Sequence, residues 1–344
     1  MANVPTLRFP GFTDEWETLM LSEIAPNISA GRSGNPIENG DFYLYGSTGI
    51  IGKTNNAQYQ GEKILIARVG ANAGKISYNN ETCGITDNTL IVKSAKISAR
   101  YLYYYLTRYN LNRLIFGSGQ PLITGGMLKK IPISFPELIE RNKIISFLSL
   151  LDERIALQSK LIDRLKSLMD GIIDKVTAWT PNISIAECLD CYSSTLQECE
   201  TEEQGTYPVY GANGVCGYLN YAAISDSAIL IVKDGSGVGN VSYTNGDCSV
   251  VGTLNYLMPK KNFSAKFLYF VLKRFNFQPY KTGMAIPHIY FKAYSKARIF
   301  SPDYEEQSRT AAYLSRIEDK IALEERLLCL LQEQKHYLLS AMFI

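Results

Sequence analysis

Two glycine-rich stretches are the first places where this chain could do chemistry, because glycine loops can cradle phosphates. Residues 46–54 read GSTGIIGKT, but a GxxxxGK[ST] phosphate loop would need glycine at position 47, which is Ser47. Residues 70–75, GANAGK, are one residue too short for that loop and are followed by Ile76. A repeat-built ATPase is therefore disfavoured. Tight turns in which only glycine tolerates the backbone explain both stretches.

Polar and basic side chains gather on and beside these loops. Arg, Asn, Gln and Ser are side chains that read base edges in DNA, and each good bidentate pair discriminates by about 1–3 kcal/mol. For any single residue, a solvated loop is the competing interpretation. We expect DNA contacts from the following residues: Arg32, Ser47, Thr48, Arg68, Asn72, Lys75, Ser118, Gln120, Asn213, Lys233, Ser236, Asn240, Lys281 and Thr282.

The cysteines and histidines form no arrangement typical of a catalytic or metal centre. Cys188 and Cys191 make a CxxC, but a structural zinc site needs a second ligand pair, and only isolated cysteines follow. His288 and His336 are the only histidines, and neither has the spacing of a catalytic or metal-binding group. We therefore expect no catalytic residue, metal or cofactor on this chain, with zinc as the minority interpretation.

The chain contains an internal repeat. Its blocks recur at an offset of 165 residues, which becomes 166 after an insertion: 45–52 (YGSTGIIG) as 210–217 (YGANGVCG), 64–70 (ILIARVG) as 229–235 (ILIVKDG), and 101–110 as 267–276. The scaffold residues of the two copies agree, whereas their loops differ. Divergent loops on matching scaffolds are what two modules reading different DNA sequences would show.

Each copy is expected to end in a long helix. Pro136 can take the first position of one helix, and Ser301 is a good N-cap for the other. Apolar residues alternate at steps of three and four, which is the heptad pattern of a coiled coil. The expected seam consists of Leu148, Leu151, Ile155, Gln158, Ile162 and Leu165 in one helix and Leu314, Ile317, Ile321, Glu324, Leu328 and Leu331 in the other.

Gln158 and Glu324 interrupt the two seams at equivalent positions of the repeat. Buried polar residues at seam positions can fix the register of a coiled coil, and we expect that role for both. The alternative is that both point to water at a loosened crossing. From Ile144 to Val176 the seam would run about 48 Å at ~1.5 Å per residue. This seam length exceeds one turn of a DNA duplex, ~34 Å, and would suffice to hold two reading domains apart on one DNA.

The repeat and the helices together predict an α+β protein made of two tandem mixed α/β domains, each followed by a long helix. The expected segments are 1–135, 136–178, 179–301 and 302–344. Within the first domain we expect strands at 41–45, 63–69, 76–78 and 89–92 and a helix at 98–116, whose counterpart starts at Ser264. Most of the five tyrosines between positions 101 and 109 are expected to pack in the core or at an interface and not to stack on bases.

Composition describes an ordinary protein of 344 residues with 46% hydrophobic and 20% charged residues. No apolar run approaches the roughly 18–20 residues needed to span a bilayer, and the start lacks a signal pattern, so we expect a cytoplasmic protein. Seven cysteines without framework spacing fit a reduced compartment. A net charge of +2 allows DNA binding only through a local basic surface.

The chain resembles the DNA-specificity subunit of type I restriction–modification enzymes over essentially its whole length. The resemblance rests on LRFPGF at 7–12, on Trp16, and on the paired YGxxGxxG, ILIxxxG and [DE]xxIAL motifs in duplicate order. It implies two target-recognition domains that read the halves of a bipartite site in double-stranded DNA, held apart by two antiparallel helices. It also implies two modification subunits that methylate adenine with S-adenosylmethionine, and restriction subunits that use ATP and magnesium.

In this resemblance the specificity subunit itself is non-catalytic, and the sequence agrees, since it has no [DN]PP[YFW] methylation motif. The recognition portion of a fused methylase–nuclease is the alternative. Repeats that look intact at both ends and a full second helix lead us to expect the separate subunit.

Overall fold

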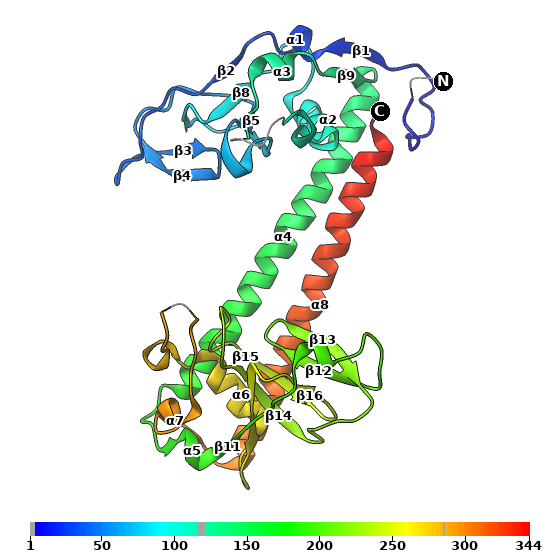
Figure 1. The fold of residues 1–344 in the computed structure, drawn as a ribbon. Coiled ribbons are helices and arrows are strands. Elements are labelled where there is room, and N and C mark those ends of the chain that lie inside the picture. Colours follow the sequence, from blue (N-terminus) through cyan, green and yellow to red (C-terminus); the bar gives the residue numbers. More distant parts are fainter. Residues whose placement is uncertain (1–3, 116–120, 285) are drawn as a thin grey trace. The chain divides into compact units, whose positions relative to one another are not determined.

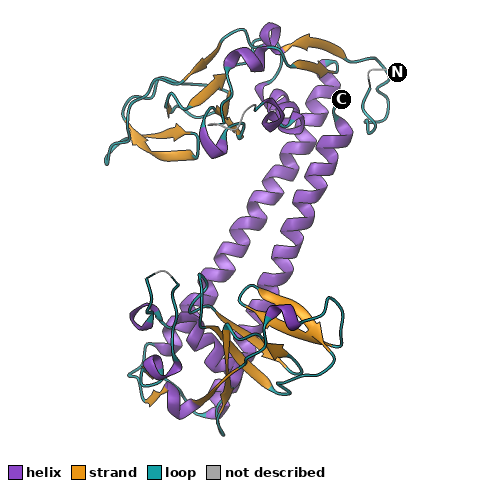
Figure 2. Cartoon of the chain, in the orientation of Figure 1, coloured by secondary structure: helices purple, strands orange, loops and turns teal. Residues whose placement is uncertain are grey.

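The computed structural model describes residues 4–115, 121–284 and 286–344. The chain divides into two compact units (Figure 1). Unit 1 comprises Met1–Gln158 with Leu327–Ile344, and unit 2 comprises Ser159–Arg326. Figure 2 shows that each unit contains strands, short helices and parts of two long helices. The predicted α+β class is confirmed.

Unit 1 contains a four-stranded antiparallel sheet, a three-stranded sheet and a strand pair. The four-stranded sheet has the order β2 (Ile28–Ala30), β8 (Thr89–Val92), β5 (Lys63–Ala67), β6 (Ile76–Asn79). The three-stranded sheet has the order β4 (Gly49–Thr54), β3 (Phe42–Gly46), β7 (Gly84–Ile85), and β1 (Glu17–Met20) pairs with β9 (Pro132–Phe135). The helices are α1 (Leu21–Ile24), α2 (Ala99–Tyr109) and α3 (Gly125–Lys129), with 3₁₀ turns at Gly70–Asn72 and Leu111–Leu114.

Unit 2 repeats this topology. Its four-stranded sheet has the order β11 (Leu189–Ser193), β17 (Leu254–Pro259), β14 (Ser227–Val232), β15 (Val241–Asn245). Its three-stranded sheet has the order β13 (Gly214–Leu219), β12 (Tyr207–Gly211), β16 (Ser249–Val250), and β10 (Ile183–Ser184) pairs with β18 (Arg298–Ile299). The helices are α5 (Ile185–Cys188), α6 (Ala265–Arg274) and α7 (Phe291–Tyr294), with 3₁₀ turns at Glu198–Glu200 and Gln278–Tyr280.

The strands expected in the first domain are present as β3, β5, β6 and β8, with ends displaced by at most two residues. Ser98 and Ser264 cap α2 and α6 as expected, since their hydroxyls accept hydrogen bonds from Arg100 and Phe267 N–H groups. The helix expected at 98–116 is shorter. It ends at Asn110, whose left-handed backbone (φ 57°) stops α-helical propagation.

The long helices are α4 (Leu138–Thr177) and α8 (Tyr304–Met342), and both begin later than expected. Pro136 is not the first helical residue, because the first intrahelical bond runs from Arg141 N–H to the Glu137 carbonyl at 3.0 Å. Ser301 is not the cap of α8. The Asp303 carboxylate accepts from Glu306 N–H at 2.9 Å.

The seam residues are buried where α4 and α8 pack together. Buried members are Leu148, Leu151, Ile162, Leu314, Ile317, Ile321 and Leu331, and Ile155, Leu165 and Leu328 are half-buried. In unit 1 the early part of α4 shares a core with the late part of α8. In unit 2 the late part of α4 bonds to the early part of α8 through Lys166 and Glu325, 2.6 Å apart. The antiparallel pairing is therefore confirmed.

The polar seam residues Gln158 and Glu324 are 9% and 6% exposed. Their burial contradicts the alternative in which both point to water. That they fix the register stays a prediction.

Most of the tyrosines of α2 are part of the core of unit 1, as expected. Tyr101, Tyr104 and Tyr105 are buried, and the rings of Tyr101 and Tyr105 pack edgewise or tilted around Phe343 near the end of the chain. Trp16 lies edgewise on Phe343 as well. The first and last segments of the sequence are therefore part of one core.

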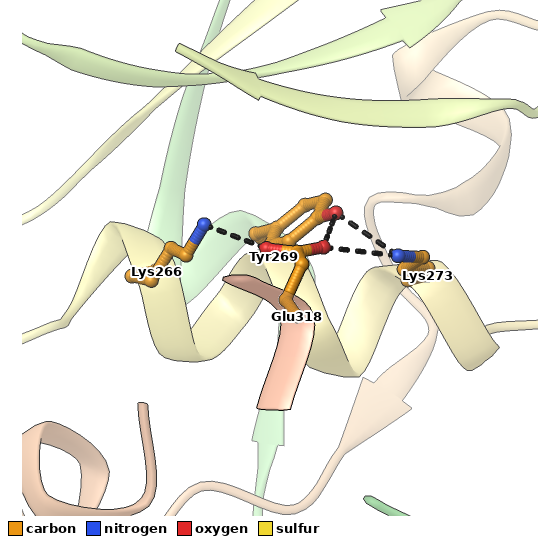
Figure 3. Close-up of polar contacts among 4 residues, drawn as sticks. All are labelled: Lys266, Tyr269, Lys273 and Glu318. Carbon is orange, nitrogen blue, oxygen red and sulfur yellow. Dashed lines mark hydrogen bonds and ion pairs between the residues drawn. The ribbon is translucent and has the colours of Figure 1, made fainter. Parts of the chain in front are cut away.

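In each unit a carboxylate on a long helix accepts hydrogen bonds from the small helix beside it. In unit 2, Glu318 of α8 accepts from Tyr269, Lys266 and Lys273 of α6 at 2.6, 3.0 and 3.1 Å (Figure 3). Its repeat equivalent in unit 1, Asp152 of α4, accepts from Tyr104 of α2 at 2.8 Å. Each carboxylate fixes the small helix on its long helix.

Candidate nucleic-acid interface

A two-residue hairpin turn presents the first predicted DNA-contacting residues of unit 1. Gly46 and Gly49 pair across β3 and β4, which leaves Ser47 and Thr48 at the tip. Gly49 has a φ of 105°, a conformation that few residues other than glycine adopt. The sequence therefore makes a tight turn with two small hydroxyl side chains at its tip, of which Thr48 is exposed and Ser47 is half-buried.

Strand pairing holds Arg32 next to this turn. Gly31 N–H donates to the Thr89 carbonyl at 3.0 Å, and Ser33 N–H donates to the Ile85 carbonyl at 2.8 Å. A Cβ on Gly31 would meet the Ile85 carbonyl oxygen at 2.2 Å, so this close approach requires glycine. The backbone on both sides of Arg32 is thus fixed to the β7–β8 segment.

These elements enclose a groove of about 490 Å³, which we call the unit 1 groove. Arg32 lines it from the end of β2, Ser47 and Thr48 from the hairpin, and Asp87 and Asn88 from the turn before β8. Its remaining lining includes Ser33, Asn35, Ile51 and Thr86.

The hairpin turn also forms one wall of a small cavity of about 80 Å³. Lys75 and Thr89 line it together with Ser47 and Thr48. Thr89 is 1% exposed, and its hydroxyl has no hydrogen-bond partner among the described residues. Lys75 also lines a hollow of about 310 Å³ with Asn72. Five predicted residues of unit 1 therefore lie along adjoining hollows.

Arg68 begins the loop that carries Asn72 and Lys75. Its N–H donates to the Asn88 carbonyl, and its carbonyl accepts from Ile123 N–H, both at 2.9 Å. Ser118 and Gln120 lie outside the described residues.

Unit 2 has an equivalent groove of about 500 Å³, which we call the unit 2 groove. Asn213 is the one predicted residue that lines it. Gln197, Glu198, Ala212, Val251 and Thr253 are among its other lining residues.

The other predicted residues of unit 2 gather on two loops that are bonded to each other. Gly235 N–H donates to the Pro287 carbonyl at 2.9 Å, and Thr282 and His288 exchange backbone hydrogen bonds at 2.9 and 2.8 Å. These loops carry Lys233, Ser236, Asn240, Lys281 and Thr282. Lys233 lies 3.5 Å from Asp234, which partly neutralises its charge.

Sequence reasoning missed Asp87, Asn88, Gln197 and Thr253, all of which line the grooves. A signal was present in the repeat. Residues 86–88 read TDN, whereas the equivalent residues 251–253 read VGT. This is the same divergence of loops on matching scaffolds that the rest of the repeat shows.

The CxxC cysteines are held as thiols. Burial raises the pKa of Cys188 to about 12 and that of Cys191 to about 11. Within 4–115, 121–284 and 286–344, no group of three or more His, Cys, Asp or Glu side chains is placed to hold a metal ion. In the same ranges, no helix has the length and apolar character needed to cross a membrane.

Comparisons with known proteins agree with the duplicated fold. A Mycoplasma pneumoniae protein named as a type I specificity subunit is 32% identical over 144 residues, or 39% of this chain and 47% of that protein. The chain thus aligns with about half the length of this relative. A second such M. pneumoniae protein is 22% identical over 290 residues, 78% of each chain.

Solved structures share the fold. The crystal structure of the type I restriction–modification system S subunit from M. genitalium matches with a TM-score of 0.74 and 17% identity, covering 99% of both chains. A second solved structure is described as showing the structural basis of complex assembly and conformational transition of the type I R-M system. It matches with a TM-score of 0.53 and 16% identity, and the match covers 97% of this chain and 98% of that chain.

The family model described as the type I restriction modification DNA specificity domain matches residues 13–167 and again residues 185–333. The two matches correspond to the two copies of the repeat. Proteins of this family are the specificity subunits of such systems and are not their catalytic components. The chain belongs to the family of type I restriction–modification DNA-specificity subunits.

Proposed function

We propose that this chain selects the DNA site of a type I restriction–modification complex, with each unit reading one half of a bipartite target in double-stranded DNA. One observation carries the proposal. The two units present grooves of nearly equal volume at equivalent positions of the repeat, and the side chains that line them differ. Equal scaffolds with unequal linings suit the two unlike halves of an asymmetric target.

In this proposal residues 1–135 and 179–301 are the target-recognition domains, and residues 136–178 and 302–344 are spacer helices. The buried seam of α4 and α8 supports a rigid spacer, because close packing resists bending. A rigid spacer would make the distance between the half-sites part of the recognised sequence.

The partners we propose are two modification subunits that methylate adenine, and restriction subunits that join them. S-adenosylmethionine, ATP and magnesium would be bound by these partners, and the assembly would work on DNA in the cytoplasm. Leu157 in unit 1 and Leu323 in unit 2 are equivalent in the repeat and are 66% and 61% exposed. Two equivalent exposed leucines support one modification subunit per copy.

Mapping methylated adenines tests the proposal directly. The chain is produced together with its modification subunits in a host without other methylation, and the methylated sites are read by sequencing. We expect one motif with two specified halves and a fixed gap. The purified chain alone should transfer no methyl group. Unaided transfer would instead support the portion of a fused methylase–nuclease.

Leu157→Glu should reduce the number of modification subunits bound from two to one. A charge placed on an apolar contact must be desolvated without a partner, which weakens docking. Native mass spectrometry of the co-purified complex gives the count. Lys160→Gln, an exposed change one turn further along α4, is the control and should leave both subunits bound. Loss of neither subunit in Leu157→Glu would contradict this docking site.

A further inference from the structure

We propose that the two grooves prefer different base pairs: the unit 1 groove reads a G·C pair through Arg32 and Asp87, and the unit 2 groove reads an A·T pair through Gln197 and Asn213. This inference rests on the proposed function and assigns a base preference to each unit.

The unit 1 groove and the unit 2 groove can be compared directly because they occupy equivalent positions of the repeat. Residues 48, 87 and 88 of the unit 1 groove correspond to residues 213, 252 and 253 of the unit 2 groove at the offset of 165. The pairing of β2 with β8 and of β11 with β17 makes Thr195 the counterpart of Arg32. The groove volumes are about 490 and 500 Å³. Since location and volume match, we attribute a difference in base preference to the side chains.

The unit 1 groove carries one charge of each sign. Within the described residues, neither Arg32 nor Asp87 forms an ion pair or a side-chain hydrogen bond, so both side chains are available to DNA. Arginine donates two hydrogen bonds to guanine O6 and N7, and a carboxylate accepts one from the cytosine amino group. A single G·C pair therefore presents acceptors to Arg32 and a donor to Asp87.

Arg32 also projects from a rigid segment. The hydroxyl of the next residue, Ser33, which is 7% exposed, accepts from Ile85 N–H at 3.0 Å and donates to the Asn56 carbonyl at 3.4 Å. A fixed backbone lowers the conformational entropy lost when the arginine binds, which favours base readout over a loose phosphate contact.

The unit 2 groove has no charged side chain at the positions equivalent to Arg32 and Asp87. Thr195 replaces Arg32, Gln197 replaces Gly34, and Gly252 replaces Asp87. Side-chain amides such as those of Gln197 and Asn213 pair with adenine N6 and N7, and apolar side chains such as Val251 contact the thymine methyl group.

Glu198, which also lines the unit 2 groove, adds discrimination. Guanine shows only acceptors, O6 and N7, in the major groove, whereas adenine shows an amino donor. A carboxylate next to the base therefore opposes guanine and tolerates adenine. Repulsion of guanine by Glu198 and attraction of adenine by the side-chain amides would therefore favour the same base.

Substitution of one groove residue in each unit tests the inference. Arg32→Gln and Gln197→Arg are each produced in the full chain with the modification subunits, and the methylated motif is mapped for both. Arg32→Gln should relax a G·C position in one half of the motif by about 10-fold and leave the other half unchanged. Gln197→Arg should change only that other half, lowering its preference for A·T. Lys96→Gln, an equal loss of charge on an exposed residue outside the groove, is the control and should leave the motif unchanged.

The outcomes separate the inference from the proposed function. A wild-type motif without two halves would overturn the proposed function. A two-part motif whose G·C preference persists in Arg32→Gln would overturn only the inference. Alteration of the same half by both substitutions would likewise overturn the inference and leave the proposed function standing. Continued methylation by the variant complexes shows that the chain is folded.

Discussion

Replacing Glu140 with alanine should lower the free energy of unfolding of unit 1 by about 3–5 kcal/mol. The Glu140 side chain is 1% exposed and that of Arg8 is 13% exposed. Arg8 donates from Nε and Nη2 to the two carboxylate oxygens, each at 2.7 Å. The pair joins the amino-terminal segment to α4, and the substitution leaves the half-buried Arg8 guanidinium without its counter-charge.

Trp16 provides the measurement, because it lies in the core of unit 1 and is 4% exposed. Trp179, the only other tryptophan, is 68% exposed and is replaced by phenylalanine in every variant compared. Urea unfolding followed by Trp16 emission then reports on unit 1.

Glu137→Ala is the matched control, since Glu137 is exposed near the same helix start. Removing the Glu137 carboxylate should lower the free energy of unfolding by less than about 1 kcal/mol, because only its interaction with the helix dipole is lost. Equal losses in the two variants would contradict a special role for the buried pair. The double change Arg8→Met with Glu140→Leu should recover much of the stability, because apolar pairs of similar volume replace buried ion pairs well.

The sequence predicted what depends on local pattern. Heptad spacing revealed the seam, β-branched runs revealed β5 and β8, and the repeat revealed two units. What it could not show depends on residues that are distant in the sequence. Glu140 lies near the start of a helix that the sequence predicts, but its partner Arg8 is 132 residues away.

The same limit applies to the grooves. Arg32, Ser47 and Thr48 were predicted from residue type and from their position on loops. Asp87 joins them because β2 pairs with β8, and strand register cannot be read from residue type alone. The helix starts were misjudged for a related reason, since the Ser301 N–H donates to Asn182 and Asp303 takes the capping position instead.

Glu318→Gln should destabilise unit 2 by about 2 kcal/mol at neutral pH, because three charge-assisted or hydroxyl hydrogen bonds converge on this carboxylate (Figure 3). The glutamine keeps an acceptor oxygen for Tyr269 but removes the charge that Lys266 and Lys273 face. The side chain is 27% exposed, so solvent moderates the loss. Hydrogen exchange of the α6 amides, measured by mass spectrometry on the full chain, gives the change in stability of unit 2.

The pH dependence distinguishes loss of charge from loss of shape. Burial alone would raise the pKa of Glu318, but the hydrogen bonds from Tyr269, Lys266 and Lys273 lower it below its ordinary value of 4.5. A carboxyl whose pKa is lowered on folding stabilises the fold fully above its unfolded pKa, and that contribution is lost as pH falls through the folded value. The difference between wild type and Glu318→Gln should therefore be constant near neutral pH and shrink below about pH 4.5.

Glu325→Gln is the control for this variant. Glu325 lies on the same helix and pairs with Lys166, but both side chains are about half exposed. An exposed pair contributes below about 1 kcal/mol and is screened by salt, so its removal should change α6 exchange little. A difference between wild type and Glu318→Gln that persists unchanged below pH 4 would mean that packing, and not the carboxylate charge, holds α6 on α8.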